Sequence, residues 1–85
     1  MITDSEILDN LDAAAAVLLD ILSDEPTRVF SMEEISRGFR ARGMDGRYLR
    51  REGWHRIANH LRAQRGGGVA LCWGVGYRLD MSGLS

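Results

Sequence analysis

The residue types able to do chemistry in this 85-residue chain are few, and their spacing does not favour catalysis or metal binding. His55 and His60 are five residues apart, which separates them by about 140° around a helix. Together with Cys72 they make three candidate ligands, whereas a structural zinc site needs four. Ser31 stands three residues before Glu34, so its hydroxyl is better placed to cap a helix than to act as a nucleophile. We therefore expect no catalytic site, no metal site and no cofactor.

Side chains that can bind nucleic acid gather in the segment around residues 50–65. An apolar residue recurs there at steps of three and four, which predicts one buried stripe along a helix: Trp54, Ile57, Ala58 and Leu61. The face opposite that stripe and its flanks carry His55, Arg56, Asn59, His60 and Arg62. Such side chains can donate to base edges in a major groove, and arginines before and after them can reach phosphates. The alternative is that they form only the solvated face of an amphipathic helix.

Charge is distributed unevenly along the chain, although the net charge is only −1. Residues 1–27 contain seven acids and no basic residue, whereas residues 28–85 contain all eleven arginines against five acids. The second part therefore has an excess of six positive charges, which predicts one basic face and one acidic end. Because local charge governs the neutralisation of phosphates, a basic face can bind nucleic acid despite the net charge.

The first half of the chain carries two helix-start signals. Thr3 and Glu6 fit a capping box, and apolar residues continue after them at helical steps. We expect one helix from about Asp4 to Leu22, with a break near Asn10 as the alternative.

A second capping box is formed by Ser31 and Glu34. It follows a short extended piece at residues 28–30 and begins a helix from about Met32 to Arg40 or Ala41. Gly43 marks the end of that helix.

The end of the chain is predicted to form a β-hairpin. The glycines at 66–68 end the preceding helix, so they do not form a phosphate-binding loop, which would open a helix. Residues 69–73 are mostly apolar, and residues 77–79 alternate after a turn that contains Gly74 and Gly76. A lone hairpin is marginal in water, so it must pack on the helices. The fold class is therefore mainly α with one small C-terminal β-hairpin.

The composition does not indicate a membrane or an oxidising compartment. No apolar run approaches the roughly 18 residues that a membrane span needs, and the first residues are acidic where a leader would be basic. The single cysteine cannot form an internal disulfide. We expect a cytoplasmic protein that does not bind membranes.

Four stretches of the chain together resemble one known family. Residues 17–22 read Val-Leu-Leu-Asp-Ile-Leu, residues 28–35 read Arg-Val-Phe-Ser-Met-Glu-Glu-Ile, residues 60–62 read His-Leu-Arg, and residues 74–79 read Gly-Val-Gly-Tyr-Arg-Leu. In that order they are similar to the first core helix, the short strand with the capped second helix, the recognition helix, and the wing of the OmpR/PhoB-type winged-helix DNA-binding domain. The resemblance covers residues 14–80, about four-fifths of the chain, and the wing signature is its most specific part.

The resemblance implies a winged helix-turn-helix of three helices and a C-terminal wing at residues 66–80. It implies a single domain over residues 1–85, with residues 1–13 extending the first helix. The helix ending near Arg65 would enter the major groove of double-stranded DNA, and the wing would approach the adjacent minor groove. Tyr77 and Leu79 are expected to pack on the core. The residues expected to contact DNA are Arg47, Arg50, Arg51, His55, Arg56, Asn59, His60, Arg62, Arg65, Trp73 and Arg78.

The chain departs from the family pattern in three respects. It has no room for the antiparallel sheet that normally precedes the first helix, and it has no receiver domain. Leu71 and Trp73 stand where the family tends to have threonine and then arginine, which weakens the expectation of a minor-groove contact. A winged helix of this size is compatible with a regulator from a phage or mobile element.

Two functions fit these observations. The first is a sequence-specific transcriptional regulator; the alternative is a winged helix used for protein–protein contact, as an adaptor or inhibitor. The acidic first helix, Trp73 and the near-neutral net charge favour that alternative. Ile7, Leu8 and Leu11 lie outside the part that matches the family, so we expect them to form a homodimer surface. The competing possibility is that they fold back over the core.

Overall fold

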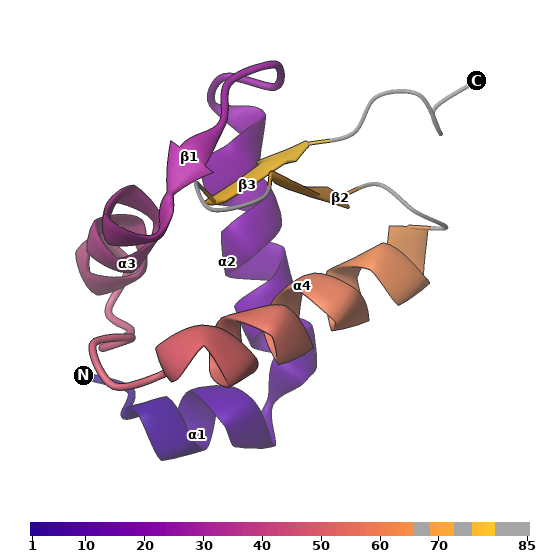
Figure 1. Ribbon diagram of the computed structural model, residues 1–85. Coiled ribbons are helices and arrows are strands. Elements are labelled where there is room, and N and C mark those ends of the chain that lie inside the picture. The colour runs from indigo at the N-terminus through magenta and orange to yellow at the C-terminus, as the bar shows by residue number, and fades with distance from the viewer. Residues whose placement is uncertain (66–68, 73–75, 80–85) are drawn as a thin grey trace.

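The structure, a computed structural model, describes residues 1–65, 69–72 and 76–79. Its helices are α1 (Asp4–Asp9), α2 (Leu11–Ser23), α3 (Met32–Ala41) and α4 (Arg50–Arg65), and its strands are β1 (Phe30–Ser31), β2 (Val69–Cys72) and β3 (Gly76–Leu79). The prediction of a mainly helical chain with an antiparallel hairpin is confirmed. In Figure 1, α2 runs through the middle of the molecule, α4 crosses in front of it, and the sheet lies above α4. None of the helices in these ranges is long and apolar enough to cross a membrane.

Both predicted capping boxes are present. The Thr3 hydroxyl accepts from the Glu6 backbone N–H at 3.3 Å, and the Glu6 carboxylate accepts in return from the Thr3 N–H at 3.3 Å. Ser31 and Glu34 make the same reciprocal pair at the start of α3, at 3.2 and 3.3 Å. Each box satisfies backbone donors that a helix start leaves without an intrahelical partner. The predicted helix starts at Asp4 and Met32 are therefore confirmed. Helix α3 also ends where predicted, at Ala41.

The expectation of one continuous helix from Asp4 to Leu22 is wrong at Asn10, where the alternative break occurs. Asn10 has φ −132° and ψ 75°, outside the helical region. Its side-chain oxygen accepts from the Ala13 N–H at 3.3 Å, so it acts as the N-cap of α2. Its own N–H donates to Glu6 and Ile7 carbonyl oxygens at 3.2 Å, which closes α1. An asparagine can thus end one helix and start the next within a single residue.

This break turns α1 back onto the core. Ile7 is only 1% exposed, and Leu8 and Leu11 are half-buried against the central apolar cluster. These three residues therefore fold back over the core, which was the competing possibility. The premise that they lack a partner within the chain, on which the expected homodimer surface depended, is wrong. Apolar side chains that are already covered within one chain offer little surface for a second copy.

The connection between α3 and α4 positions the start of α4. Gly43 follows the last turn of α3 with φ 83°, a left-handed conformation that glycine adopts without steric cost. Met44 and Leu49 are buried within this connection. Helix α4 begins at Arg50, so Arg50 and Arg51 belong to its first turn. Arg50 has φ 55°, and a left-handed conformation costs an L-residue roughly 1–2 kcal/mol.

The predicted apolar stripe of the third helix is confirmed. Trp54, Ile57, Ala58 and Leu61 are all at most 6% exposed. The Trp54 ring meets Phe39 of α3 edge to face, with ring centroids 5.0 Å apart and an interplanar angle of 89°. These contacts fix the rotation of α4 about its own axis, and its remaining faces are left to polar side chains.

The hairpin strands β2 and β3 belong to a three-stranded antiparallel sheet with the order β1-β3-β2, in which β3 is central. The extended piece predicted at residues 28–30 forms its strand at Phe30–Ser31, with Phe30 opposite Tyr77 and Ser31 opposite Gly76. Tyr77 and Leu79 are 2% and 5% exposed, so their predicted packing on the core is confirmed.

Gly76 occupies a position that no side chain can share. A Cβ atom added there would lie 1.9 Å from the Phe30 carbonyl oxygen, well inside van der Waals contact. Because that neighbour is backbone, it can move only by displacing β1 from β3. Glycine is therefore required at position 76 by the close approach of these two strands.

We predict that Gly76→Ala lowers the free energy of unfolding by about 3 kcal/mol or more, because overpacking against a rigid neighbour costs about 1–3 kcal/mol and occasionally more. Urea unfolding followed by circular dichroism measures the change. Gly43→Ala is the matched control, since that position has positive φ but open space around it, so only a conformational cost of about 1 kcal/mol is expected. Equal losses from the two variants would contradict the steric explanation.

Candidate nucleic-acid interface

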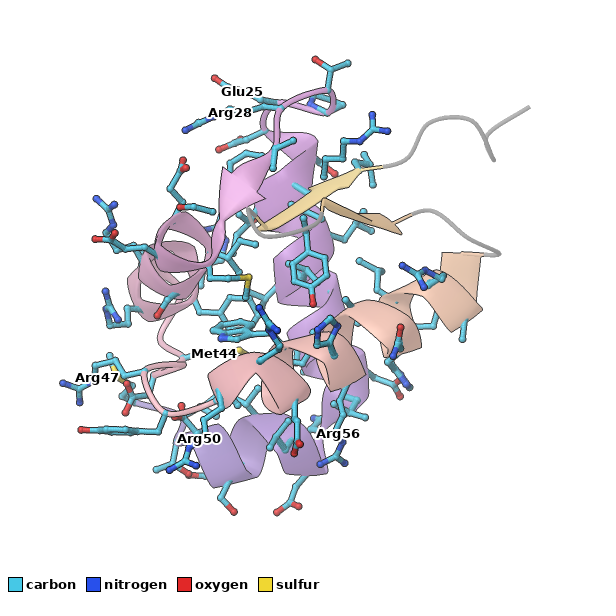
Figure 2. All side chains as sticks on the ribbon, viewed as in Figure 1. Glu25, Arg28, Met44, Arg47, Arg50 and Arg56 are labelled. Carbon is cyan, nitrogen blue, oxygen red and sulfur yellow. The ribbon has the colours of Figure 1, made fainter. Side chains whose placement is uncertain are left out.

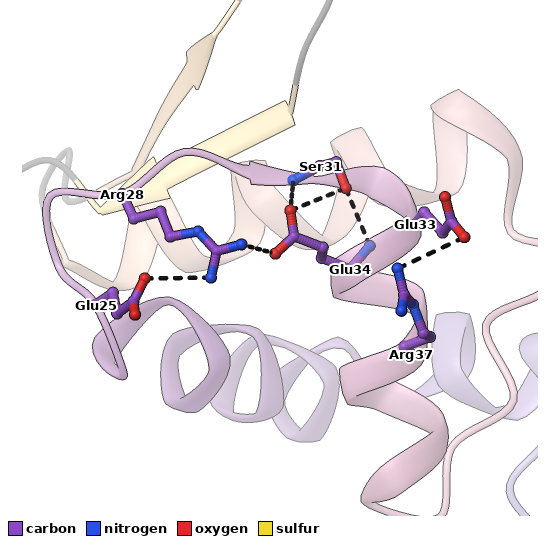
Figure 3. A network of polar contacts seen from close by, with 6 residues as sticks. All are labelled: Glu25, Arg28, Ser31, Glu33, Glu34 and Arg37. Carbon is purple, nitrogen blue, oxygen red and sulfur yellow. Dashed lines mark hydrogen bonds and ion pairs between the residues drawn. The ribbon is translucent and has the colours of Figure 1, made fainter.

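Arginines outside α4 are mostly paired with acids. Arg28 bridges Glu25 and Glu34, and Arg37 contacts Glu33 at 3.5 Å (Figure 3). Arg42 donates to Asp20 at 2.8 Å. These pairs connect the end of α2 with α3, and they neutralise much of the positive charge on that side of the molecule.

The arginines of α4 are different. Arg50, Arg51 and Arg56 are exposed and have no acidic partner among residues 1–65, 69–72 and 76–79. Figure 2 shows Arg50 and Arg56 extending outward from α4. Asn59 and Glu52 are exposed on the face opposite the buried stripe. This helix therefore presents positive charge without acidic partners among the described residues, beside an amide that donates and accepts hydrogen bonds and a carboxylate that accepts them.

His60 lies on the side of α4 that faces α2. Its Nε2 is 2.6 Å from an Asp12 carboxylate oxygen, and the Gln64 amide donates to the same oxygen at 2.9 Å. The sequence grouped His60 with the outward-facing donors. The structure instead places its ring at the contact with the acidic helix, where Asp12 competes for its hydrogen bond.

His55 lies on the opposite flank, against the sheet. Its Nδ1 is 3.1 Å from the Tyr77 hydroxyl, and the two rings meet at 81° with centroids 6.0 Å apart. Burial raises the pKa of the Tyr77 phenol, and the positive charges of Arg62 and Arg51 act in the opposite direction. Both arginines therefore lie on the same side of α4 as this pair.

The turn before α4 carries one further arginine and an exposed aromatic ring. Arg47 donates from Nε to Asp45 at 2.7 Å, a hydrogen bond that lowers the pKa of the Asp45 carboxyl. The guanidinium also lies 5.5 Å from the centroid of Tyr48, which is 72% exposed. Arg47 is thus held close to the start of α4 and is partly neutralised there.

Residues 2–4 hold this turn from the other end of the chain, and we call them the N-terminal strap. Ile2 donates to the Gly43 carbonyl and accepts from the Asp45 N–H, both at 2.8 Å. The Asp4 carboxylate accepts from the Gly46 N–H at 2.5 Å and from the Tyr48 N–H. Sequence reasoning missed the strap, because Asp4 is also a favourable residue for the first turn of a helix and its partners are more than 40 residues away.

The remaining predicted contact residues have mixed positions. Arg62 is exposed on α4, and Arg78 is exposed on β3. The predictions for the Arg65 side chain and for Trp73 lie outside the described residues. The structure therefore brings Arg50, Arg51 and Arg56 together with Asn59 on one helix, and it separates His60 from them.

We predict that Asp4→Asn weakens the strap, because the amide loses the charge and one of the two acceptor oxygens. The free energy of unfolding should fall by about 1–3 kcal/mol. Amide exchange at Gly46 and Tyr48 should become faster, as measured by NMR. Asp9→Asn is the control, since it removes the same charge from an exposed site in α1. A small effect of Asp4→Asn, with unchanged amide exchange at Gly46 and Tyr48, would contradict the role of Asp4 in the strap.

We also predict that Tyr77 makes stability fall at high pH. Its pKa is raised in the folded protein above the ordinary value of 10.0, so between the two values only the unfolded chain has lost the proton. Stability from this group is complete below pH 10 and is lost as the pH rises through the folded-state pKa. The stability difference between wild type and Tyr77→Phe should therefore shrink above pH 10, by up to about 1.4 kcal/mol per pH unit. Tyr48→Phe, which changes an exposed ring, is the control, and a constant difference for Tyr77→Phe would contradict the prediction.

Comparison with protein-family models, with curated proteins and with solved structures finds no match to this chain. A function for this chain is therefore inferred from the geometry and charge of α4 and its neighbours.

Proposed function

We propose that this protein is a sequence-specific DNA-binding regulator of transcription with winged-helix architecture. In this proposal α4 enters the major groove and the β2–β3 hairpin lies beside it as the wing. The observation that carries it is the group of exposed arginines on α4 without acidic partners among the described residues: Arg50, Arg51 and Arg56. Most arginines before α4, by contrast, are paired with acids. As a regulator of this class the protein would act in the cytoplasm.

The order of elements supports the architectural part of the proposal. A short strand separates α2 from α3, the exposed helix α4 follows, and a hairpin closes the chain. Strand β3 lies between β1 and β2, so the hairpin is joined to the helical part through β1. This arrangement agrees with what the resemblance to OmpR/PhoB-type domains implies.

The side chains of α4 support two kinds of DNA contact, one to bases and one to phosphates. Arg56 and Asn59 are exposed near the face opposite the core, where a helix in the major groove meets base edges. Arginine pairs well with guanine acceptors, and asparagine pairs with the donor and acceptor of adenine. Arg50 and Arg51 in the first turn would reach phosphates and contribute affinity without sequence preference.

The distribution of negative charge is consistent with one defined DNA-facing side. The acids of α1 and α2, such as Asp9, Asp12 and Asp20, are exposed on helices that α4 packs against. They would repel a duplex that approached from that side. DNA is therefore expected to meet α4 from the side away from α2.

A second candidate, a protein-binding module, is favoured by one observation. The large apolar side chains exposed among the described residues, Met1, Ile2 and Tyr48, all belong to the N-terminal strap, the residue before it, or the turn that it holds. Exposed apolar groups of this kind suit a protein contact. This surface lies beside the start of α4, so the two functions can coexist.

The proposal is tested by selecting duplexes from a random pool with the wild-type protein and measuring affinities by mobility shift. We predict that Arg56→Ala and Asn59→Ala each cost about 1–3 kcal/mol at one base pair of the selected site and relax preference there. Arg51→Ala should weaken all duplexes alike and reduce the salt slope by about 1. Arg37→Ala, which removes a paired arginine from α3, is the matched control and should change little. Equal losses from all four changes would contradict a specific interface on α4.

For Arg50 we predict that the change to glycine weakens DNA binding without weakening the fold. Glycine relieves the left-handed strain at this position, roughly 1–2 kcal/mol, while losing about 1 kcal/mol of helix propensity. A thermal melt should therefore stay within a few degrees of wild type. Unchanged binding on non-specific duplexes would remove Arg50 from the phosphate contacts.

A further inference from the structure

The pair formed by His55 and Tyr77 joins α4 to the hairpin. Tyr77 is 2% exposed, and its hydroxyl lies 3.1 Å from His55 Nδ1. Within the described residues this hydroxyl has no second hydrogen-bond partner. A buried phenol hydroxyl almost always donates its proton to an acceptor, and Nδ1 can accept only when it carries no proton.

We expect the hydrogen bond to run from the Tyr77 O–H to His55 Nδ1, which puts the proton of the neutral imidazole on Nε2. Which nitrogen of a histidine carries the proton is set by the hydrogen bond that the other nitrogen makes. Nε2 has no partner among the residues that the structure describes. His55 is thus held as a hydrogen-bond donor whose donating atom is available to a ligand.

The neighbours of His55 along α4 are also donors. Arg51 precedes it by four residues and Arg62 follows it by seven, so all three lie within about 40° of one another around the helix. This row is about 16 Å long at 1.5 Å per residue. It lies on the flank that faces the sheet, whereas Glu52 and Asn59 lie opposite the core.

A row of side chains that only donate hydrogen bonds is complementary to a row of groups that only accept them. Base edges present donors and acceptors together, so readers of bases usually need both, as Asn59 and Glu52 offer. Phosphate oxygens of a DNA strand only accept, and a helix lying in the major groove has strand backbones along its flanks. The row from Arg51 to Arg62 therefore matches a phosphate backbone and not a base edge.

We infer that His55 donates its Nε2–H to a phosphate oxygen of the DNA strand that runs beside the hairpin, next to a phosphate contacted by Arg51. Tyr77 is a positioning residue, since it fixes the tautomer and the orientation of His55 without touching DNA. This inference rests on the proposed DNA-binding function. It gives the buried tyrosine of the hairpin a role in DNA affinity besides packing.

The first arm of the test uses the free protein, so it does not depend on DNA binding. Long-range nitrogen–proton NMR spectra of the imidazole rings distinguish the two tautomers at a pH where His55 is neutral. The expected result is the Nε2–H tautomer for His55 in wild type and a mixture of tautomers in Tyr77→Phe. The Nδ1–H tautomer in wild type, or no change in the variant, would overturn the positioning role of Tyr77. His60→Gln assigns the signals, because it leaves His55 as the only histidine.

The second arm is a double-mutant cycle in DNA affinity, on a selected duplex and on a scrambled one. Tyr77→Phe should weaken both duplexes equally, by about 3- to 10-fold, as expected for one hydrogen bond. In the His55→Gln background, where the donated N–H depends on no tautomer, Tyr77→Phe should have no further effect. Circular dichroism of each variant confirms that the fold is retained.

Three outcomes would overturn the phosphate contact. A loss confined to the selected duplex would make His55 a reader of bases. An equal loss from Tyr77→Phe in the His55→Gln background would show that Tyr77 acts only through packing of the hairpin. Absence of DNA binding by wild type would remove the proposed function and the phosphate contact together, and the NMR arm would still decide the tautomer.

Discussion

The apolar contact between α2 and α4 is the interaction on which the rest of this structure depends. Leu18 and Leu22 of α2 and Ile57 and Leu61 of α4 are among its most completely buried side chains. Burial of each side chain of this size contributes roughly 1.5–3 kcal/mol, and only a continuous stripe collects these contributions together. The rotation of α4 is therefore determined by its apolar residues. Its arginines are exposed because the stripe leaves them no buried position.

The sheet adds a second constraint on the same helix. Gly76 lets β3 approach β1 closely, and Tyr77 then reaches His55 from the next position along the strand. The hairpin is thus attached to both β1 and α4, on the flank opposite Asp12 and His60. One side of α4 is bounded by the sheet and the other by the acidic helix α2. The exposed side chains of α4 therefore lie on the strip between these two neighbours.

Patterns local in sequence predicted much of this fold. The capping boxes at Thr3 and Ser31 are confirmed because their partners are three residues away, and the stripe of α4 is confirmed because helical periodicity is a local property. The break at Asn10 was harder to predict, since four alanines begin three residues later and favour helix on their own.

Features that depend on tertiary placement could not be predicted in the same way. The burial of Ile7 depends on the direction in which α1 turns after Asn10, and no pattern encodes that direction. His60 and Arg56 look equivalent on a helical wheel, yet the contact of α4 with α2 places one of them against Asp12 and leaves the other exposed. The pairing of His55 with Tyr77 joins residues 22 positions apart. It could not be predicted without knowing the register of the sheet, which sets the position of Tyr77.

The N-terminal strap has a consequence for how the chain folds during its synthesis. Residues 2–4 are synthesised roughly 40 residues before the backbone groups that they bind, at residues 43–48. At about 5–20 residues per second this delay is about 2–8 s, far longer than helix formation. The residues of α1 and α2 have therefore all been synthesised before the strap can close. The strap closes only once α3 has been completed and the turn after it has emerged, so residues 2–4 reach their final place well after they are synthesised.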